Sequence, residues 1–248
     1  MDINQRSMKV TKKIEQELQQ IPEGRLFRYE DLPIEPSEYE AAAKAMGRYV
    51  STGTLKRVSK GVFYKPEQTI FGLMPPSDED IIRQYIFKNG YRTAYITGTG
   101  LYNRMGLTTQ VPFVYVLATK TRRSEIMIGK VKIKPVRSYV DVDNENYKLL
   151  GILDALKDFK IIQDINRISA IIVLKSQLRA LSSEDLNNMI RYSINYPPRT
   201  RALLGALLED MNSPQDLSLL KKTLSPASQF RMGITPKILS NATKWHLK

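Results

Sequence analysis

The sequence contains no cysteine and only one histidine, His246. Without cysteine, the chain has no disulfides, no thiolate metal sites and no cysteine nucleophile. A single histidine near the end of the sequence argues against a multi-histidine metal site and against a serine–histidine triad. We therefore expect a protein that is not an enzyme, with no catalytic residues, no metal site and no cofactor.

Long apolar runs are also lacking. No run approaches the roughly 18 residues that a membrane span requires. The N-terminus does not show the basic-then-apolar order of a signal peptide. These absences predict a cytoplasmic protein with no membrane partner.

Acidic residues are fewer than basic residues. The 248 residues include 38 basic and 25 acidic side chains, a formal net charge of +13, which predicts a polyanionic partner. The excess is uneven: residues 1–74 carry +2 and residues 191–248 carry +6. The C-terminal quarter thus holds almost half of the net charge. Hydrophobic residues make up 42% of the sequence, which is typical of a folded protein.

The first 66 residues predict elements in the order of a winged helix-turn-helix. Four apolar residues at helical spacing predict an amphipathic first helix: Val10, Ile14, Leu18 and Ile21. Residues 25–28 predict a short extended segment, and 29–32 one helical turn. A longer helix is predicted over about 37–52, with Ser37 as its N-cap and Gly53 at its C′ position. Residues 54–65 predict a β-hairpin with its turn at Lys60-Gly61.

The longer helix is predicted to have two distinct sides. The expected inner stripe consists of Tyr39, Ala42, Ala43, Met46, Tyr49 and Val50. The opposite side combines small residues with cations: Ala41, Lys44, Ala45, Arg48 and Ser51. Small side chains let a recognition helix enter the major groove, and its cations reach bases or phosphates. A solvated helix face has the same composition, so the helix alone does not decide between the two.

The predicted hairpin adds further cations. Lys56, Arg57 and Lys60 lie on or beside it, where the wing of this motif contacts DNA. A charged edge that protects a two-stranded ribbon is the alternative. The helix and hairpin together favour DNA binding through Lys44, Arg48, Ser51, Lys56, Arg57 and Lys60.

The rest of the chain predicts a mixed domain. Residues 71–76 read as a linker with enough apolar side chains to pack, followed by a helix capped by Ser77. A strand is expected over 91–96, a short helix over 97–105, and three antiparallel strands over 111–119, 124–128 and 130–135. Helices follow from residue 144, with starts at Ser182 and at Ser213-Pro214. The stretch from about Ser225 is weakly patterned, and we expect it to be loosely held.

The predicted fold class is therefore α+β: an N-terminal winged helix-turn-helix, then a domain with a small antiparallel sheet and a helical C-terminal part. The expected domains are residues 1–74 and 75–248.

Three further groups of residues are candidates for a functional role. Gly98-Thr99-Gly100 fits a tight strand-to-helix turn better than a nucleotide loop, because no Lys-Ser/Thr pair follows. Asp141, Asp143 and Glu145 lack the glycine and terminal glutamate of a calcium loop and favour a solvated connection. An aromatic–arginine group around Pro197-Pro198 is compatible with nucleic-acid binding, a protein interface or a helix–helix corner. Its members are Arg191, Tyr192, Tyr196, Arg199 and Arg201.

Two sequence blocks resemble the AbiEi-like antitoxins of type IV abortive-infection modules and their winged-helix bacterial relatives. Residues 43–50, 53 and 55–66 resemble the winged-helix part of that family, and residues 96–112 resemble the start of its next domain. The resemblance covers roughly residues 8–165, with a weaker echo at 196–205. It implies a DNA-binding autorepressor that recognises inverted repeats in its own promoter and opposes a nucleotidyltransferase toxin. By position it also implies Lys44 and Arg48 as recognition-helix residues, and Arg57 and Lys60 as wing residues.

A second class of function stays open. The winged helix can instead be a structural module of a protein-binding or RNA-binding adaptor that has no toxin partner. Binding to the upstream promoter would separate the two classes.

Overall fold

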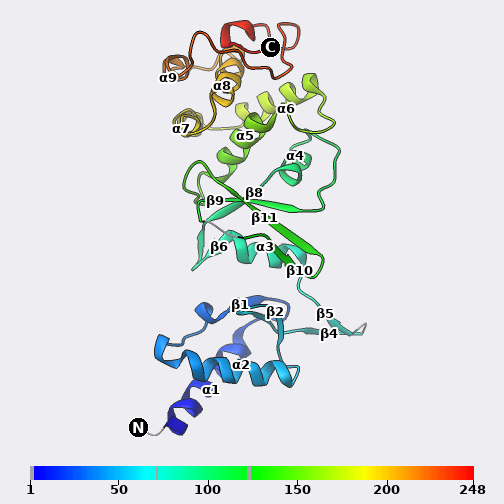
Figure 1. Cartoon of the computed structure of the whole chain (residues 1–248), viewed down its shortest axis with the longest axis vertical. Helices are drawn as coiled ribbons and strands as arrows, with labels where there is room; N and C mark the ends of the chain where they lie inside the picture. The colour runs from blue at the N-terminus through cyan, green and yellow to red at the C-terminus, as the bar shows by residue number, and fades with distance from the viewer. Residues whose placement is uncertain (1–2, 71, 122–123) are drawn as a thin grey trace. The chain divides into compact units, whose positions relative to one another are not determined.

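The computed structural model describes residues 3–70, 72–121 and 124–248, and it has a mixed α+β fold with small antiparallel sheets and several helices (Figure 1). The chain forms two compact units. The first extends to Tyr91 and includes Ile126–Lys132. The second consists of Arg92–Glu125 and Ile133–Lys248.

The first unit begins with two helices and a three-stranded sheet. Its elements are α1 (Ile3–Gln20), β1 (Leu26–Arg28), the 3-10 turns η1 (Tyr29–Asp31) and η2 (Pro36–Glu38), α2 (Tyr39–Ser51), β2 (Lys56–Ser59) and β3 (Val62–Tyr64). The strand order is β1-β3-β2, with both pairs antiparallel. The predicted helices and hairpin are therefore present.

The start of α2 differs from the prediction. Its N-cap is Glu38 and not Ser37, because Pro36 first opens a 3-10 turn. The Glu38 carboxylate accepts a hydrogen bond from the backbone N–H of Glu35 at 3.0 Å, which closes that turn. The C-terminal signal was correct: Gly53 follows α2 with φ of +79°, a conformation that favours glycine.

The core of this unit lies between α1 and α2. Val10, Ile14 and Leu18 are buried as the periodicity predicted. From α2 the buried residues are Ala42, Ala45 and Met46. The predicted stripe was therefore wrong at three positions: Ala43 is exposed, Tyr39 is 43% exposed, and Ala45 is buried. Five of the seven residues 39–45 are alanine or tyrosine, and such weakly polar residues leave the orientation of the helix poorly specified.

The region after β3 does not form a packed linker. β4 (Glu67–Thr69) and β5 (Gly72–Met74) pair as an antiparallel two-stranded sheet. Leu73 and Met74 are exposed, contrary to the expectation that the apolar side chains would pack. Phe71, which belonged to the predicted linker, lies outside the described residues.

α3 (Asp78–Ile86) is capped by Ser77, whose hydroxyl accepts from the backbone N–H of Asp80 as predicted. The Gln84 side-chain amide donates to the Leu26 carbonyl at 2.7 Å. The Arg28 guanidinium stacks on the Tyr85 ring, 5.4 Å from its centroid. Because these contacts attach α3 to β1, the first unit extends beyond the boundary that we expected after residue 74. Two short strands follow, β6 (Phe87–Lys88) and β7 (Tyr91–Arg92).

A four-stranded sheet follows, in the order β10-β11-β9-β8. Its strands are β8 (Ala94–Thr97), β9 (Tyr115–Thr119), β10 (Ile126–Ile128) and β11 (Val131–Arg137). β8 and β9 are antiparallel, but β11 pairs with β9 in parallel. The expectation of three antiparallel strands was therefore wrong. The connection from β9 to β11 contains β10.

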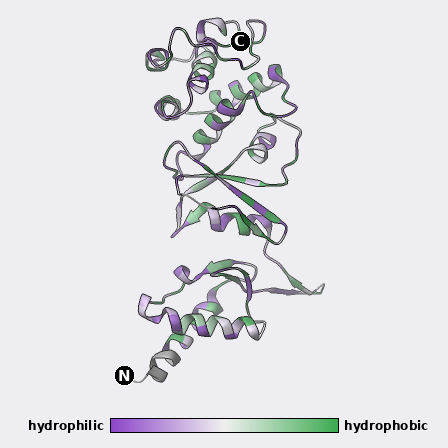
Figure 2. Cartoon of the chain, in the orientation of Figure 1, coloured by the Kyte–Doolittle hydropathy of each residue, from purple (hydrophilic) through white to green (hydrophobic). Residues whose placement is uncertain are grey.

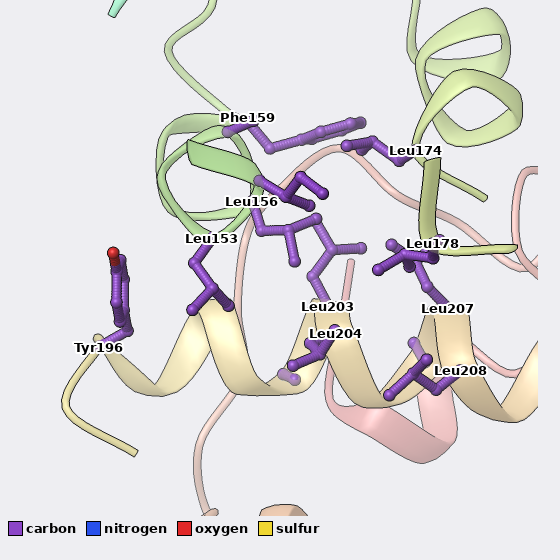
Figure 3. Packing of buried hydrophobic residues seen from close by; sticks show 14 of the residues in the cluster. Leu153, Leu156, Phe159, Leu174, Leu178, Tyr196, Leu203, Leu204, Leu207 and Leu208 are labelled. Carbon is purple, nitrogen blue, oxygen red and sulfur yellow. The ribbon is translucent and has the colours of Figure 1, made fainter. Parts of the chain in front are cut away.

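The second unit continues with a helical part. It contains α5 (Tyr147–Asp158), α6 (Arg167–Arg179), α7 (Ser183–Ser193), α8 (Pro198–Asp210), α9 (Ser218–Lys222) and η3 (Thr243–Trp245). Figure 3 shows leucines of α5, α6 and α8 packed together in its core. α7 begins after Ser182 as predicted. α9 begins later than expected from Ser213-Pro214, with Leu217 as its N-cap. The Asp216 carboxylate accepts hydrogen bonds from the backbone N–H and the hydroxyl of Ser218, the first residue of α9.

Buried Asp154 joins the sheet to α5. It is 2% exposed and accepts hydrogen bonds from the Tyr95 hydroxyl at 2.9 Å and the Thr97 hydroxyl at 2.7 Å. Lys157 balances its charge, with 3.1 Å between ammonium and carboxylate. Burial, followed by the Asp154 charge, raises the pKa of Tyr95. The hydroxyl therefore stays protonated and keeps donating to Asp154.

The last 24 residues are not loosely held, contrary to the expectation. Six of their apolar side chains are buried: Met232, Ile234, Leu239, Ala242, Trp245 and Leu247. The Trp245 indole N–H donates to the Glu209 carboxylate at 2.9 Å. The segment has little regular structure, so its buried residues follow no helical or strand period that a sequence pattern can reveal.

Candidate nucleic-acid interface

One side of α2 is exposed along its whole length. The exposed residues recur every three or four positions: Glu40, Ala43, Lys44, Gly47, Arg48 and Ser51. In Figure 2 hydrophilic residues alternate with hydrophobic ones along this helix. The small residues at 43, 47 and 51 keep the backbone accessible, and two cations flank them. The predicted outer side included Ala45, which is buried, and it omitted Ala43 and Gly47, which are exposed.

Lys44 is held only weakly. Its ammonium lies 3.1 Å from the Glu40 carboxylate, and the two side chains are 73% and 85% exposed. Exposed ion pairs of this kind contribute about 0.3–0.5 kcal/mol on a helix. A phosphate can therefore replace Glu40 as the partner of Lys44 at little cost.

Arg48 is oriented by α1. Its guanidinium donates a hydrogen bond to the Thr11 hydroxyl at 3.2 Å, and the side chain remains exposed. Ser51 donates to the Arg48 carbonyl at 2.8 Å. The Ser51 hydroxyl has therefore used its proton, but it is exposed and can still accept a hydrogen bond.

The β2–β3 hairpin presents the remaining predicted residues. Lys56 and Arg57 on β2 and Lys60 at the turn are exposed, whereas Val62 and Phe63 on β3 are buried. The register shifts between Arg57 and Ser59, which marks a bulge in β2. The Arg57 guanidinium donates to the Ser59 carbonyl at 3.3 Å across this bulge.

Aromatic contacts connect the hairpin to the start of α2. The Tyr29 ring lies 5.4 Å from the Tyr39 ring and 5.4 Å, edge-on, from the Phe63 ring. Burial raises the pKa of Tyr29, and the Arg57 charge partly opposes this. Such aromatic pairs contribute about 0.5–1.5 kcal/mol each. They connect the hairpin to the helix, and residues of both elements belong to one hydrophobic core.

The charges of this unit are segregated along the sequence. Residues 41–66 contain six basic residues and no acidic one, whereas residues 29–40 contain five acidic residues and no basic one. The second half of α2 and the hairpin therefore carry positive charge only. The net charge of +2 over residues 1–74 averages these two stretches, so the separation can be seen only when net charge is summed over shorter segments of the sequence. We call the exposed set Lys44, Arg48, Ser51, Lys56, Arg57 and Lys60 the basic face.

Comparison with known proteins gives a family but no activity. Residues 13–177 match a family of unknown function, DUF6088. The chain belongs to this family. The DUF6088 match begins within α1 and ends within α6, so it includes the whole basic face. No curated protein matches the chain.

Among solved structures, the DUF6088 chain is similar to the crystal structure of the RV2827C protein from Mycobacterium tuberculosis. The TM-score is 0.48 at 12% identity, and the alignment covers 90% of this chain and 85% of that one.

The glycine turn at residues 98–100 and the acidic group at residues 141–145 have structural roles. Gly98 is the N-cap residue between β8 and α4 (Thr99–Arg104), with φ of +68°. The Asp143 carboxylate accepts from two backbone N–H groups at the start of α5. In the part of the chain that the structure describes, no cluster of acidic and histidine side chains could hold a metal ion. Nor is any described helix long and apolar enough to cross a membrane.

The aromatic–arginine group forms the corner between α7 and α8. Tyr196 is buried and donates to the Leu150 carbonyl at 3.4 Å. Arg201 donates to the carbonyls of Ile194, Tyr196 and Thr223. These bonds favour the helix–helix corner among the three interpretations.

Proposed function

We propose that this DUF6088 protein is a DNA-binding transcriptional regulator, with residues 8–66 as a winged helix-turn-helix. In this proposal α2 is the recognition helix and the β2–β3 hairpin is the wing. The observation that carries the proposal is the basic face itself. Its five cations lie on a helix and a hairpin that share one core, within residues 41–66, which contain no acidic residue.

The geometry of α2 supports insertion into a major groove. From residue 43 onward, the residues beside the cations on its outward side are small, namely Ala43, Gly47 and Ser51, so the helix backbone can approach base edges closely. Lys44 and Arg48 lie one turn apart, within reach of successive bases or phosphates. Lys56, Arg57 and Lys60 then contact the DNA backbone or minor groove, as wings do.

The resemblance to AbiEi-like antitoxins extends the proposal. We infer that the protein represses its own promoter at inverted repeats and acts as the antitoxin of a type IV module. The second unit contains residues 96–112, the block that resembles the domain after the winged helix in that family. Under the proposal this unit opposes a nucleotidyltransferase toxin.

A binding assay with full-length protein tests the DNA-binding role. Fluorescence anisotropy with the labelled upstream promoter compares wild type with Lys44→Ala/Arg48→Ala and with Lys56→Ala/Arg57→Ala/Lys60→Ala. Both variants are expected to bind weakly. The matched control Lys88→Ala/Lys130→Ala removes two exposed cations of the same unit and should bind like wild type. Equal affinity of all four proteins would overturn the proposal and favour the adaptor.

The antitoxin role is tested separately by co-expression with a neighbouring nucleotidyltransferase gene. Rescue of growth by wild type is expected, and the Lys44→Ala/Arg48→Ala variant should rescue equally, because the second unit is intact in it. Growth arrest in the presence of the wild-type protein would refute the antitoxin role and leave the DNA-binding role unaffected.

A further inference from the structure

The second unit contains a cavity with a concentration of cations. It has a volume of about 490 Å³ and is lined by Lys157, Lys160, Ile161, Arg199, Gln229, Phe230, Arg231 and Met232. None of the lining side chains is acidic. We call this the basic cavity. It lies wholly between residues 157 and 232 and is separate from the basic face.

Three of its four cations keep their charge uncompensated. Lys157 lies 3.1 Å from Asp154 and 3.5 Å from Asp158, which neutralise it. Within the described residues, by contrast, no carboxylate pairs with Lys160, Arg199 or Arg231. All three side chains are exposed, so an anion that enters the cavity from solvent can reach them without first displacing a carboxylate.

Arg199 is positioned by the fold. Its Nε donates to the Lys157 carbonyl at 3.1 Å, which holds the start of α8 against the end of α5. An anchored guanidinium loses less side-chain entropy when it binds a phosphate, and its planar shape suits bidentate contact.

The other wall of the cavity is apolar. Ile161 is 71% exposed, and the half-buried Phe230 contributes further apolar surface, whereas Met232 is buried beneath it. The Phe230 backbone is held in place, since its N–H donates to the His246 carbonyl at 2.7 Å and its carbonyl accepts from Lys248 at 2.9 Å. An aromatic ring beside exposed aliphatic carbon provides a surface on which a planar base can stack.

We propose that the basic cavity binds a nucleoside di- or triphosphate. Lys160, Arg199 and Arg231 contact the phosphates, while Phe230 and Ile161 contact the base. The volume suits a single small ligand, since such sites measure roughly 300–1,000 Å³. The single neutral polar side chain, Gln229, gives little discrimination between bases, so purine and pyrimidine nucleotides should both bind. The proposal does not depend on the DNA-binding role.

Isothermal titration of the full-length protein with ATP, GTP, CTP and tripolyphosphate tests it. Wild type should bind all four nucleotide and phosphate probes saturably, and the nucleotides more tightly than tripolyphosphate. Lys160→Ala/Arg231→Ala should weaken all of them by about tenfold or more, because charge-assisted hydrogen bonds are lost. Lys237→Ala, which removes an exposed lysine of the same C-terminal segment outside the cavity, should have no effect.

The base contact is tested with Phe230→Leu and with Ile161→Ser, which changes an exposed side chain and leaves the core intact. Both should weaken ATP and GTP binding about threefold to tenfold and leave tripolyphosphate binding unchanged. No binding of any nucleotide at millimolar concentration would overturn the proposal. The proposal would also be overturned if Ile161→Ser lost affinity for ATP and for tripolyphosphate equally. The same holds if ATP and tripolyphosphate did not displace each other from the wild-type protein. Tight binding of a single-stranded oligonucleotide that ATP does not displace would instead show a nucleic-acid groove.

Discussion

Gly205 lies in the middle of α8, where a side chain has no room. A Cβ at this position would lie 2.2 Å from two ring carbons of Trp245, which is itself 1% exposed. Replacement of a helical glycine by alanine usually stabilises a helix. Here the reverse is expected: Gly205→Ala should destabilise the protein by about 1–3 kcal/mol, because the core becomes overpacked. Urea denaturation measures the effect.

Gly47 provides the matched control for that prediction. It lies in α2, and no atom lies within 4 Å of the position that a Cβ would occupy. Gly47→Ala should therefore stabilise the protein by about 0.5–1 kcal/mol. Destabilisation by both variants would contradict the explanation based on Trp245.

Glu209 connects α8 to the C-terminal segment. Its carboxylate accepts from Lys244 at 2.8 Å, Lys221 at 3.0 Å and Trp245 at 2.9 Å. Burial opposes its ionisation, but these hydrogen bonds outweigh burial and lower the pKa of Glu209 to about 2. The folded state therefore favours the ionised form more than the unfolded state does.

The pH dependence follows from this difference. The stabilisation by Glu209 is fully present above its ordinary pKa of 4.5 and is lost as the pH falls from there towards 2. Glu209→Gln should be less stable than wild type at pH 7, and the difference in melting temperature should shrink across this window. A difference that is constant from pH 7 to pH 2 would show that the charge of Glu209 contributes nothing.

At the scale of the element, α2 combines packing and proposed recognition on opposite sides. Ala42, Ala45 and Met46 are buried against α1, whereas Lys44 and Arg48 are exposed. Arg48→Ala should therefore weaken promoter binding by roughly 1–3 kcal/mol. It should change the unfolding free energy by less than about 1 kcal/mol, since only the exposed hydrogen bond to Thr11 is lost.

Met46→Ala is the contrasting variant on the same helix. It removes a fully buried side chain and should destabilise the protein by about 2–5 kcal/mol. A large loss of stability in Arg48→Ala, with no specific change in DNA affinity, would assign Arg48 a structural role instead.

At the scale of the whole molecule, the net charge of +13 has two candidate uses. If the five cations of the basic face contact phosphates, log K should fall with log salt with a slope of about −3 to −5 per protomer. The C-terminal segment 191–248 carries +6 and offers a competing explanation. Part of that charge is occupied within the fold, because Lys221 and Lys244 pair with Glu209.

Charge variants of the full chain separate the two explanations. A fragment of residues 1–74 would lack α3, which the structure attaches to β1 through Gln84 and Tyr85. Replacement of the five cations of the basic face by alanine should reduce the salt slope to near zero. Replacement of Lys222 and Lys237 should leave it unchanged. The opposite outcome would locate DNA binding in the C-terminal segment.

Features of this chain that depend on neighbouring residues could be predicted from the sequence. The spacing of Val10, Ile14 and Leu18 identified the buried side of α1, and Ser77 and Ser182 marked two helix starts. The Lys60-Gly61 turn located the hairpin. All six residues of the basic face were found as candidates and are exposed on α2 or on the β2–β3 hairpin. Periodicity, capping and turn preference act over a few residues, so they can be seen in a single sequence.

Other features depended on residues distant in the sequence. The parallel pairing of β9 and β11, the attachment of α3 to β1 and the burial of Trp245 against Gly205 have no local signal. The choice of Ala45 over Ala43 as the buried residue of α2 belongs with them, because an alanine fits either side of a helix until α1 packs against one. Direction of pairing, domain boundary and helix orientation are decided by contacts across the fold, where the burial of apolar surface selects one arrangement among several that the local preferences allow.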